Sequence, residues 1–309
     1  MRIGVDVGGT KIEIIALADD GDVLVRQRVA SPRHDYAATL RTIHALVTDV
    51  EAVTRQVGTV GVAIPGTISS TTGLVKNANS TWLIGQPLGR DLARDLRRPV
   101  RVANDANCFA LSEATDGAAA GAGSVFGVIV GTGTGAGVVV NGQVLVGVNG
   151  VAGEWGHNPM PWPRHGEWPG AACYCGRTGC IETFLSGPAL TRDYQLSTKA
   201  ALANSPTAQE LTAQEIVTRA AAGDLAAGLC LERYEDRFAR ALASVINVLD
   251  PDVIVLGGGL SNVDRLYDAV PARWSAYVFS DVVATRLLKA QHGDSSGVRG
   301  AAWLWPAVS

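Results

Sequence analysis

Residues 126–147 read FGVIVGTGTGAGVVVNGQVLVG. An apolar run ends at a cluster of glycines and threonines, Gly131–Gly135, and a second apolar run follows at once. Asn141-Gly142 then separates this run from a third, and the dipeptide favours a tight turn because both residues tolerate a positive φ. The stretch therefore predicts a strand, a glycine loop, a strand, a tight turn and a further strand.

The N-terminus repeats this order. Residues 3–7 (IGVDV) predict a strand, Gly8-Gly9-Thr10 a loop, and residues 11–18 and 23–30 two more strands separated by the turn DDGD. A dinucleotide-binding loop opens a helix, whereas a strand follows both loops here, so the sequence argues against NAD. Two similar glycine loops indicate instead a polyphosphate site built from backbone N–H groups; the alternative is a pair of ordinary hairpin turns.

The rest of the chain alternates between helix and strand patterns. Apolar residues recur at helical spacing over residues 35–53, and buried strands are expected over 59–66 and 99–105. Helices dominate residues 186–249, and residues 251–270 predict a strand, a glycine turn and a helix. This alternation indicates an α/β protein.

The chain is long enough for two domains. We place the main boundary near Thr115, which gives a small N-terminal lobe over residues 1–115 and a large lobe over residues 116–291. Residues 292–309 are expected to pack back on the small lobe.

The composition is that of a soluble globular protein, with 309 residues, 47% hydrophobic and 18% charged. The formal net charge of −3 gives no reason to expect a nucleic acid or an anionic membrane as a partner. The N-terminus lacks the apolar region of a signal peptide, and no apolar run is long enough to cross a bilayer. We therefore expect a cytoplasmic protein.

A metal site is indicated where His157 is followed by Cys173-x-Cys175-x₄-Cys180. Three thiolates and one imidazole are the ligands of a tetrahedral structural zinc site. The alternative is a loop with three unligated thiols. Since protein side chains fill all four ligand positions, such a zinc ion holds no catalytic water.

Acidic residues follow two of the predicted strands. Asp105 follows the strand over 99–105 in the segment ANDAN, where it can act as a general base or, with Asn104, cap the next helix. Asn104 can also donate and accept hydrogen bonds to a polyol. Asp6 ends the first strand, where it can hold Mg²⁺ through water or accept N–H groups of the turn.

Two glutamates flank the predicted metal ligands. Glu154 lies in GEWGHNP and Glu182 in GCIETF. A metal cluster fixes the loop that carries it, and a sugar site needs fixed hydrogen-bond acceptors. Their position next to the cluster makes both glutamates candidates for sugar binding.

Together these motifs resemble a known family. DVGGTK, the repeated strand–loop–hairpin unit and VLGGG resemble the actin/hexokinase-like (ribonuclease H-like) ATPase fold, which is duplicated and has two lobes around a cleft. EWGHNP followed by CYCGRTGCIE resembles the signature of the ROK family of bacterial sugar kinases and repressors. KNANSTW, ANDANCFALSEA and HGDSSGVRGAAWLWP resemble fructokinases of the manno(fructo)kinase type.

The resemblance implies an ATP-dependent kinase that phosphorylates the 6-hydroxyl of fructose, and also of mannose, with Asp105 as the base. It implies Mg²⁺, structural zinc and a homodimer. The phosphate loops would be Gly8, Gly9, Thr10, Lys11 and Gly131, Thr132, Gly133, Thr134, Gly135, while Gly257, Gly258 and Gly259 would lie against adenosine. The hexose would be contacted by Gly66, Asn79, Asn104, Glu154, His157 and Glu182, with one ring nitrogen of His157 on zinc and the other toward the sugar.

Three alternatives stay open. Glucose, mannose or N-acetylglucosamine can be the preferred hexose, because small contacts separate these sugars. A sugar-responsive repressor would need an added helix-turn-helix, for which the strand beginning near Arg2 leaves no room. A sugar sensor without catalysis is disfavoured by the intact Asp105 and by both glycine loops.

Overall fold

The structure is a computed structural model that describes residues 1–201, 211–293 and 296–306. Its contacts divide the chain into two units, which are described separately below. The first unit comprises Met1–Gly127, Gly137–Gly153 and Ala290–Ser309, and the second comprises Val128–Ala136 and Glu154–Lys289. These limits differ from the boundary that we placed near Thr115, because the strands over 124–140 belong partly to each unit.

The first unit is built on a five-stranded sheet with the order β3-β2-β1-β4-β7. Its strands are β1 (Arg2–Val7), β2 (Lys11–Leu17), β3 (Val23–Ala30), β4 (Thr59–Ile64) and β7 (Val100–Asn104). β1, β2 and β3 form antiparallel pairs, whereas β1, β4 and β7 run parallel. The sheet confirms the predicted N-terminal hairpin unit and the two buried strands that follow it.

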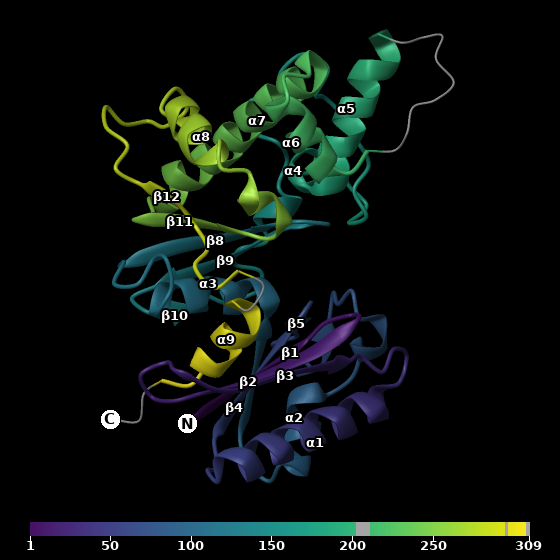
Figure 1. Cartoon of the computed structure of the whole chain (residues 1–309), viewed down its shortest axis with the longest axis vertical. Coiled ribbons are helices and arrows are strands. Elements are labelled where there is room, and N and C mark those ends of the chain that lie inside the picture. The colour runs from purple at the N-terminus through teal and green to yellow at the C-terminus, as the bar shows by residue number, and fades with distance from the viewer. Residues whose placement is uncertain (202–210, 294–295, 307–309) are drawn as a thin grey trace. The chain divides into compact units, whose positions relative to one another are not determined.

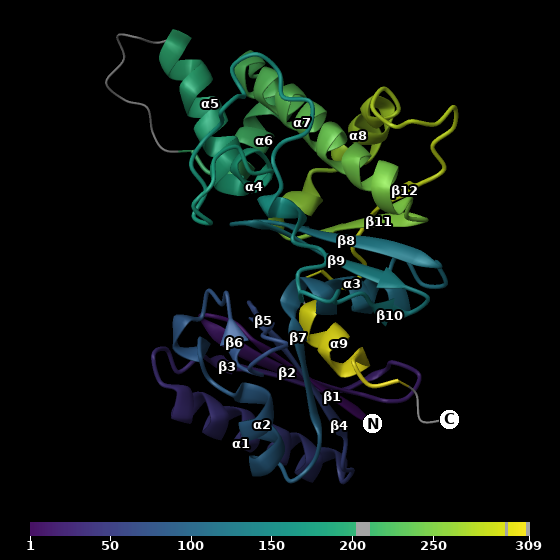
Figure 2. The same ribbon diagram turned by 180° about the vertical axis from the view of Figure 1, so that it is seen from behind.

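Helices cover both faces of this sheet (Figures 1 and 2). On one face, α1 (Tyr36–Thr54) begins after Asp35, whose side chain accepts a hydrogen bond from the Ala38 N–H, and it packs with α2 (Leu88–Asp95) over the buried side chains of β1. On the other face, α9 (Ser296–Trp303) contacts β1, β2 and β4. Gly4 permits this close approach, because a Cβ there would overlap the Val298 carbonyl.

Shorter elements complete the first unit. β5 (Thr67–Ile68) and β6 (Val75–Lys76) form a small hairpin, and the 3₁₀ turn η1 (Thr81–Leu83) follows it. α3 (Asp105–Thr115) follows β7 directly and packs against α9. A segment from the beginning of the chain, one from its middle and one from its end therefore share this core.

The second sheet has the order β10-β9-β8-β11-β12. Its strands are β8 (Ser124–Val130), β9 (Thr134–Val140), β10 (Gln143–Val144), β11 (Val253–Gly257) and β12 (Arg286–Lys289). Numbered along the chain, both sheets therefore have the strand order third, second, first, fourth, fifth. This agreement confirms the repeat that the two glycine loops suggested, and with it the duplicated actin/hexokinase-like fold.

The helices of the second unit lie on one side of β11 and β12 (Figure 1). They are α4 (Glu182–Leu185), α5 (Gly187–Ala201), α6 (Ala213–Ala221), α7 (Leu225–Leu249) and α8 (Leu266–Trp274), with the 3₁₀ turns η2 (Trp155–His157) and η3 (Gly259–Asn262). α7 is the central helix, since it packs against α4, α5, α6 and α8. The helix-rich region predicted for residues 186–249 corresponds to α5, α6 and α7.

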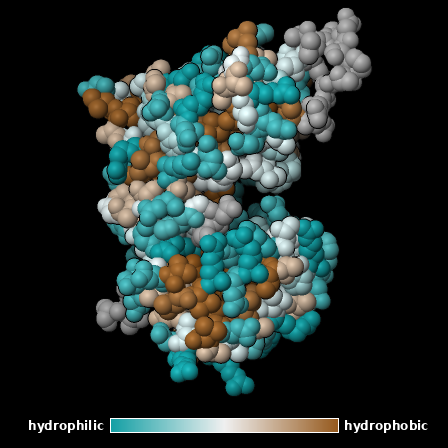
Figure 3. All heavy atoms as spheres, in the orientation of Figure 1, coloured by the Kyte–Doolittle hydropathy of each residue, from teal (hydrophilic) through white to brown (hydrophobic). Residues whose placement is uncertain are grey.

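No helix among the described residues is both long and apolar enough to span a bilayer. Most of the face shown in Figure 3 is hydrophilic, and its hydrophobic residues gather in separate patches.

Candidate functional site

In the first unit, candidate residues gather where parallel strands end. The register pairs Asp6 of β1 with Ala63 of β4, and Ile64 of β4 with Asn104 of β7. Asn104 Nδ2 donates a hydrogen bond to the carbonyl of Gly66 at 3.1 Å. The carboxyl ends of parallel strands are where α/β proteins place their ligands.

Asn104 and Asp105 have different positions in α3. Asn104 is the N-cap, and its Oδ1 accepts from the N–H of Ala106 at 2.9 Å and of Asn107 at 3.3 Å. Asp105 is the first helical residue, and its Oδ1 accepts from the Ala106 N–H at 2.8 Å. Of the two capping residues that the sequence allowed, Asn104 is therefore the cap.

Asp6 lies in a strongly perturbed environment. Burial raises the pKa of its carboxyl from 3.8 to about 7, with further contributions from the negative charges of Asp105 and Glu13. The positive charges of Lys11 and Arg28 oppose this rise. Asp6 and Asp105 are thus close enough for the charge of one to affect ionisation of the other. A cation placed next to Asp6 would favour its ionised form.

The first glycine loop is a tight turn held by its neighbours. The Gly8 N–H donates to the Lys11 carbonyl at 3.0 Å, and the Ser31 N–H donates to the Thr10 carbonyl at 3.0 Å. Arg33 Nε donates to the Gly9 carbonyl at 2.9 Å. Arg33 lies far from the loop in the sequence, and no motif pointed to its role in holding it.

Asn79 lies in the same unit, on the chain that follows β6. Its N–H donates to the Pro65 carbonyl at 3.0 Å. A Cβ on Gly66 would lie 2.8 Å from the Ala78 side chain, so this close packing requires glycine. Gly66, Asn79 and Asn104 are thereby joined through backbone and amide contacts.

The second glycine loop lies in the second unit, between β8 and β9. The Gly131 N–H donates to the Gly133 carbonyl at 2.9 Å, whereas Thr134 and Gly135 already belong to β9. The Gly257–Gly259 turn packs against the end of β8. Gly258 has a φ of 81°, and a Cβ there would overlap the Val130 carbonyl, so this position requires glycine. The loop and the turn, which the sequence assigned to one nucleotide, are neighbours.

Glu182 contacts this loop from outside it. Its Oε2 accepts a hydrogen bond from the Thr134 N–H at 2.9 Å. The sequence offered Glu182 only as a sugar-binding residue, and no pattern linked it to the glycine loop.

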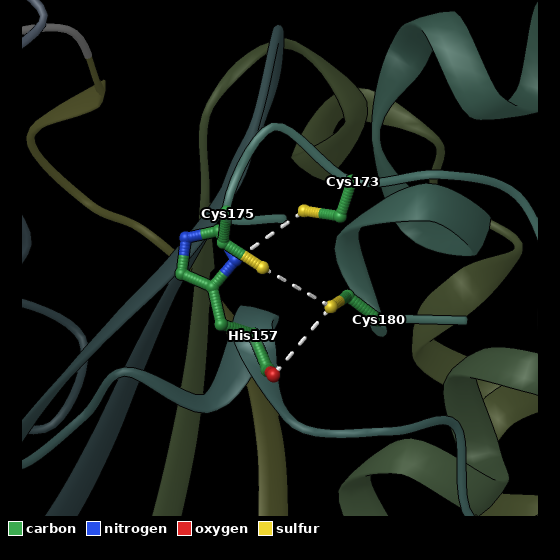
Figure 4. A group of neighbouring side chains, drawn as sticks. All are labelled: His157, Cys173, Cys175 and Cys180. Atoms are coloured by element: carbon green, nitrogen blue, oxygen red, sulfur yellow. Dashed lines mark hydrogen bonds between the residues drawn. The ribbon is translucent and has the colours of Figure 1, made fainter. Parts of the chain in front are cut away.

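The four predicted metal ligands form a cluster in the second unit (Figure 4). The donor atoms of His157, Cys173, Cys175 and Cys180 all lie within 4.8 Å of one another. His157 Nδ1 lies 3.6 Å from Cys173 Sγ, and Cys175 Sγ lies 3.6 Å from Cys180 Sγ. Sulfur ligands at about 2.3 Å from a tetrahedral zinc ion lie about 3.8 Å apart. The donor set and its spacing therefore fit zinc.

The loop that carries these ligands turns at two glycines. Gly176 and Gly179 have φ values of 86° and 70°, and the Gly176 N–H donates to the Cys173 carbonyl at 3.0 Å. Only glycine adopts such angles without strain. The loop can therefore reverse twice between its cysteines.

The other ring nitrogen of His157 has a partner that the sequence did not suggest. Its Nε2 lies 2.9 Å from the hydroxyl of Tyr174, which is 77% exposed. Although most of the Tyr174 side chain is exposed, desolvation of its hydroxyl and then nearby Glu182, Cys173 and Glu154 raise its pKa to about 12. The resemblance assigned this nitrogen to the sugar, whereas a phenol occupies it here, near the two candidate glutamates.

The candidate residues fall into two groups. Asp6, the first glycine loop, Gly66, Asn79, Asn104 and Asp105 lie in the first unit, whereas the second glycine loop, Glu154, His157, Glu182 and the Gly257–Gly259 turn lie in the second.

Comparison with known proteins shows a match over the whole chain. The ROK family model matches residues 2–308. An N-acetyl-D-glucosamine kinase of Vibrio cholerae serotype O1 is 42% identical over 308 residues, covering 98% of this chain and 99% of the relative.

Two solved structures extend the comparison. A ROK hexokinase from Thermus thermophilus superposes with a TM-score of 0.83 at 30% identity, covering 98% of this chain and 96% of the other. A ROK glucokinase from Streptomyces griseus, in complex with glucose and AMPPNP, gives a TM-score of 0.77 at 28% identity and covers 98% of both chains. With its repeated hairpin unit and its His/Cys cluster, this chain belongs to the ROK family.

Proposed function

We propose that this chain is an ATP-dependent kinase that phosphorylates N-acetyl-D-glucosamine. The observation that carries the proposal is the 42% identity, over nearly the full length of both chains, to the N-acetyl-D-glucosamine kinase of Vibrio cholerae. The sequence motifs had pointed first to fructose and only second to this sugar. Whole-chain similarity weighs more here than short motifs, because it compares every residue of the chain, including those whose small contacts distinguish one hexose from another.

In the proposed reaction, Asp105 is the general base. It takes the proton of the attacking sugar hydroxyl as that oxygen forms a bond to the γ-phosphorus of ATP, and ADP leaves. The position of Asp105 supports this role, since it follows β7 at the carboxyl edge of the sheet. Asn104 cannot supply the base, but its amide can bind a sugar hydroxyl while its oxygen caps α3.

The remaining sugar contacts are proposed from the resemblance. They are Gly66 and Asn79 with Asn104 in the first unit, and Glu154, His157 and Glu182 in the second. Carboxylates are strong hydrogen-bond acceptors for sugar hydroxyls. A site that forms such hydrogen bonds discriminates against a sugar that lacks the matching hydroxyl. His157 Nε2 can bind a sugar hydroxyl only if the hydroxyl of Tyr174 first moves away from this nitrogen.

The two glycine loops are proposed to bind the ATP phosphates through their N–H groups, with Gly257–Gly259 against the adenosine. Mg²⁺ bound with ATP supplies positive charge that offsets charge developing on the phosphate oxygens. Asp6 is proposed to hold this ion through water. Its perturbed carboxyl supports the assignment, since a buried acid next to Asp105 needs a cation to stay ionised.

A structural zinc ion is proposed at His157, Cys173, Cys175 and Cys180. Zinc there would fix the loop between Glu154 and Glu182 and would take no part in the chemistry. A cytoplasmic homodimer without a nucleic-acid or membrane partner stays a prediction.

A coupled assay of ADP release tests the proposal. The purified chain is supplied with ATP and Mg²⁺ and with N-acetylglucosamine, fructose, mannose or glucose in turn. We expect the highest kcat/KM with N-acetylglucosamine. A higher kcat/KM with fructose would restore the hypothesis of a fructokinase, and absence of turnover with every hexose would favour a sugar-responsive regulator.

A further inference from the structure

The short helix α4 spans the second glycine loop. Glu182, the first residue of α4, accepts a hydrogen bond from the Thr134 N–H at 2.9 Å. Gly187, two residues after the helix ends, donates its N–H to the Gly131 carbonyl at 2.7 Å. Both ends of the loop Gly131–Thr134 are therefore hydrogen-bonded to one short segment, at the first residue of α4 and at Gly187, the first residue of α5.

The contact made by Glu182 is enclosed. Thr134 is only 5% exposed, and its carbonyl packs against Gly156, where a Cβ would overlap it. A Cβ on Gly133 would lie 2.7 Å from Glu182 Oε2, so the missing side chain is what lets the carboxylate approach. The Thr134 N–H thus faces Glu182 from inside the protein.

The hydrogen bonds within the loop determine which N–H groups remain for a ligand. The Gly131 N–H is taken by the Gly133 carbonyl, and the Thr134 N–H by Glu182. Among the described contacts, the N–H groups of Thr132 and Gly133 have no such partner. The carboxylate accordingly shapes the loop without occupying the N–H groups that would bind a phosphate.

We propose that Glu182 is a positioning residue for the nucleotide loop. Its charged acceptor holds Thr134 in place, and so keeps the N–H groups of Thr132 and Gly133 directed at the phosphates. This inference rests on the proposed function, in which the loop binds ATP and Glu182 also contacts the sugar. One carboxylate then contacts both substrate sites, and any effect of sugar on nucleotide affinity through it is matched by an equal effect of nucleotide on sugar affinity.

Calorimetric titration of a nonhydrolysable ATP analogue with Mg²⁺, in the absence of sugar, isolates the effect on the loop. We expect Glu182→Ala to weaken binding of the analogue by about 10-fold, since a charged hydrogen bond is lost. Glu182→Gln keeps an oxygen that accepts the Thr134 N–H, and should recover affinity to within about 3-fold of the parent. Glu154→Ala is the matched control, because this exposed glutamate has no described hydrogen bond to the loop; it should leave analogue affinity unchanged and weaken only sugar binding.

A double-mutant cycle tests whether the effect passes through this contact. Gly133→Ala pushes a methyl group against Glu182 Oε2, so it should weaken analogue binding in the parent. In the Glu182→Ala background the clash is gone, and the same substitution should have a smaller effect. Strict additivity would show that the carboxylate and the loop act independently, and would overturn the inference.

The other outcomes are also decisive. Unchanged or tighter analogue binding by a folded Glu182→Ala variant would overturn the positioning role while leaving the kinase proposal intact. Dependence of analogue binding on Glu182 in a chain that phosphorylates no hexose would support the role and refute the kinase proposal. If the parent chain binds no analogue at all, the loop is not a nucleotide site and the inference is wrong.

Discussion

Replacing Asp6 by asparagine should increase the free energy of unfolding relative to the parent, and the increase should grow as the pH rises. Burial raises the pKa of this carboxyl from 3.8 to about 7, so the folded state binds the proton more tightly than the unfolded state does. At 1.36 kcal/mol for each unit, this difference corresponds to a loss of up to about 4 kcal/mol from the parent. The loss develops between the two pKa values and is complete above about pH 7. Asparagine does not ionise, so the variant does not lose this free energy of unfolding.

The measurement is the free energy of urea unfolding at pH 5, 6, 7 and 8, in buffer without Mg²⁺ and without nucleotide. The variant should exceed the parent by a margin that grows from about 2 kcal/mol at pH 5 to about 4 kcal/mol at pH 8. Asp49→Asn, at an exposed position of α1, is the control for the amide substitution itself. A margin that is the same at pH 5 and pH 8 would refute the argument. Turnover should nevertheless fall in Asp6→Asn, because this carboxylate is proposed to hold Mg²⁺.

Three further outcomes are expected. Asp105→Asn should lower kcat by about 10²–10⁴-fold and leave sugar affinity within about 10-fold, as measured by ADP release and calorimetry; turnover close to the parent's would exclude Asp105 as the base. Cys175→Ala should remove bound zinc, measured by mass spectrometry, and raise the KM for sugar more than that for ATP; equal Michaelis constants in the zinc-free variant would show that the cluster does not support sugar binding. His292→Ala should destabilise the protein more at pH 6 than at pH 8.5, because the hydrogen bond to Asp116 raises the pKa of His292 and its stabilising charge is lost as the pH rises; an equal loss of unfolding free energy at both pH values would contradict this.

The pH dependence of His292 reflects how the C-terminal segment is held. Its N–H donates to Glu113 at 3.2 Å, and its Nε2 lies 3.2 Å from Asp116 Oδ1. Arg299 also pairs with Asp116, and against the effect of burial the hydrogen bonds from His292 and Arg299 lower the pKa of that carboxyl. These contacts tie residues after Ala290 to α3, which is how the end of the chain joins the first unit.

The His/Cys cluster was the group of candidate residues that the sequence predicted most completely. Cys173, Cys175 and Cys180 lie close together in the chain, and Gly176 and Gly179 permit the turns between them. A short loop brings the three cysteines together by local geometry, whereas His157, 16 residues before Cys173, reaches them through the path of the intervening chain. The repeated hairpins could be predicted equally well, because strand, glycine and turn patterns are local in the chain.

Contacts between segments that are distant in the chain could not be predicted from the sequence. Arg33 on the first glycine loop, Tyr174 on His157 and Glu182 on Thr134 each join residues that no motif links. A hydrogen bond of this kind depends on the path of the intervening chain and on the direction of one side chain, neither of which has a periodic signature.

The sequence by itself thus determined the duplicated α/β fold and indicated the two glycine loops and the members of the His/Cys cluster, because spacing along the chain carries all three. Only the tertiary structure decided that Asn104 rather than Asp105 caps α3, that burial perturbs Asp6, and that Glu182 reaches the glycine loop. These depend on which groups are enclosed together, and burial and charge act through space rather than along the chain.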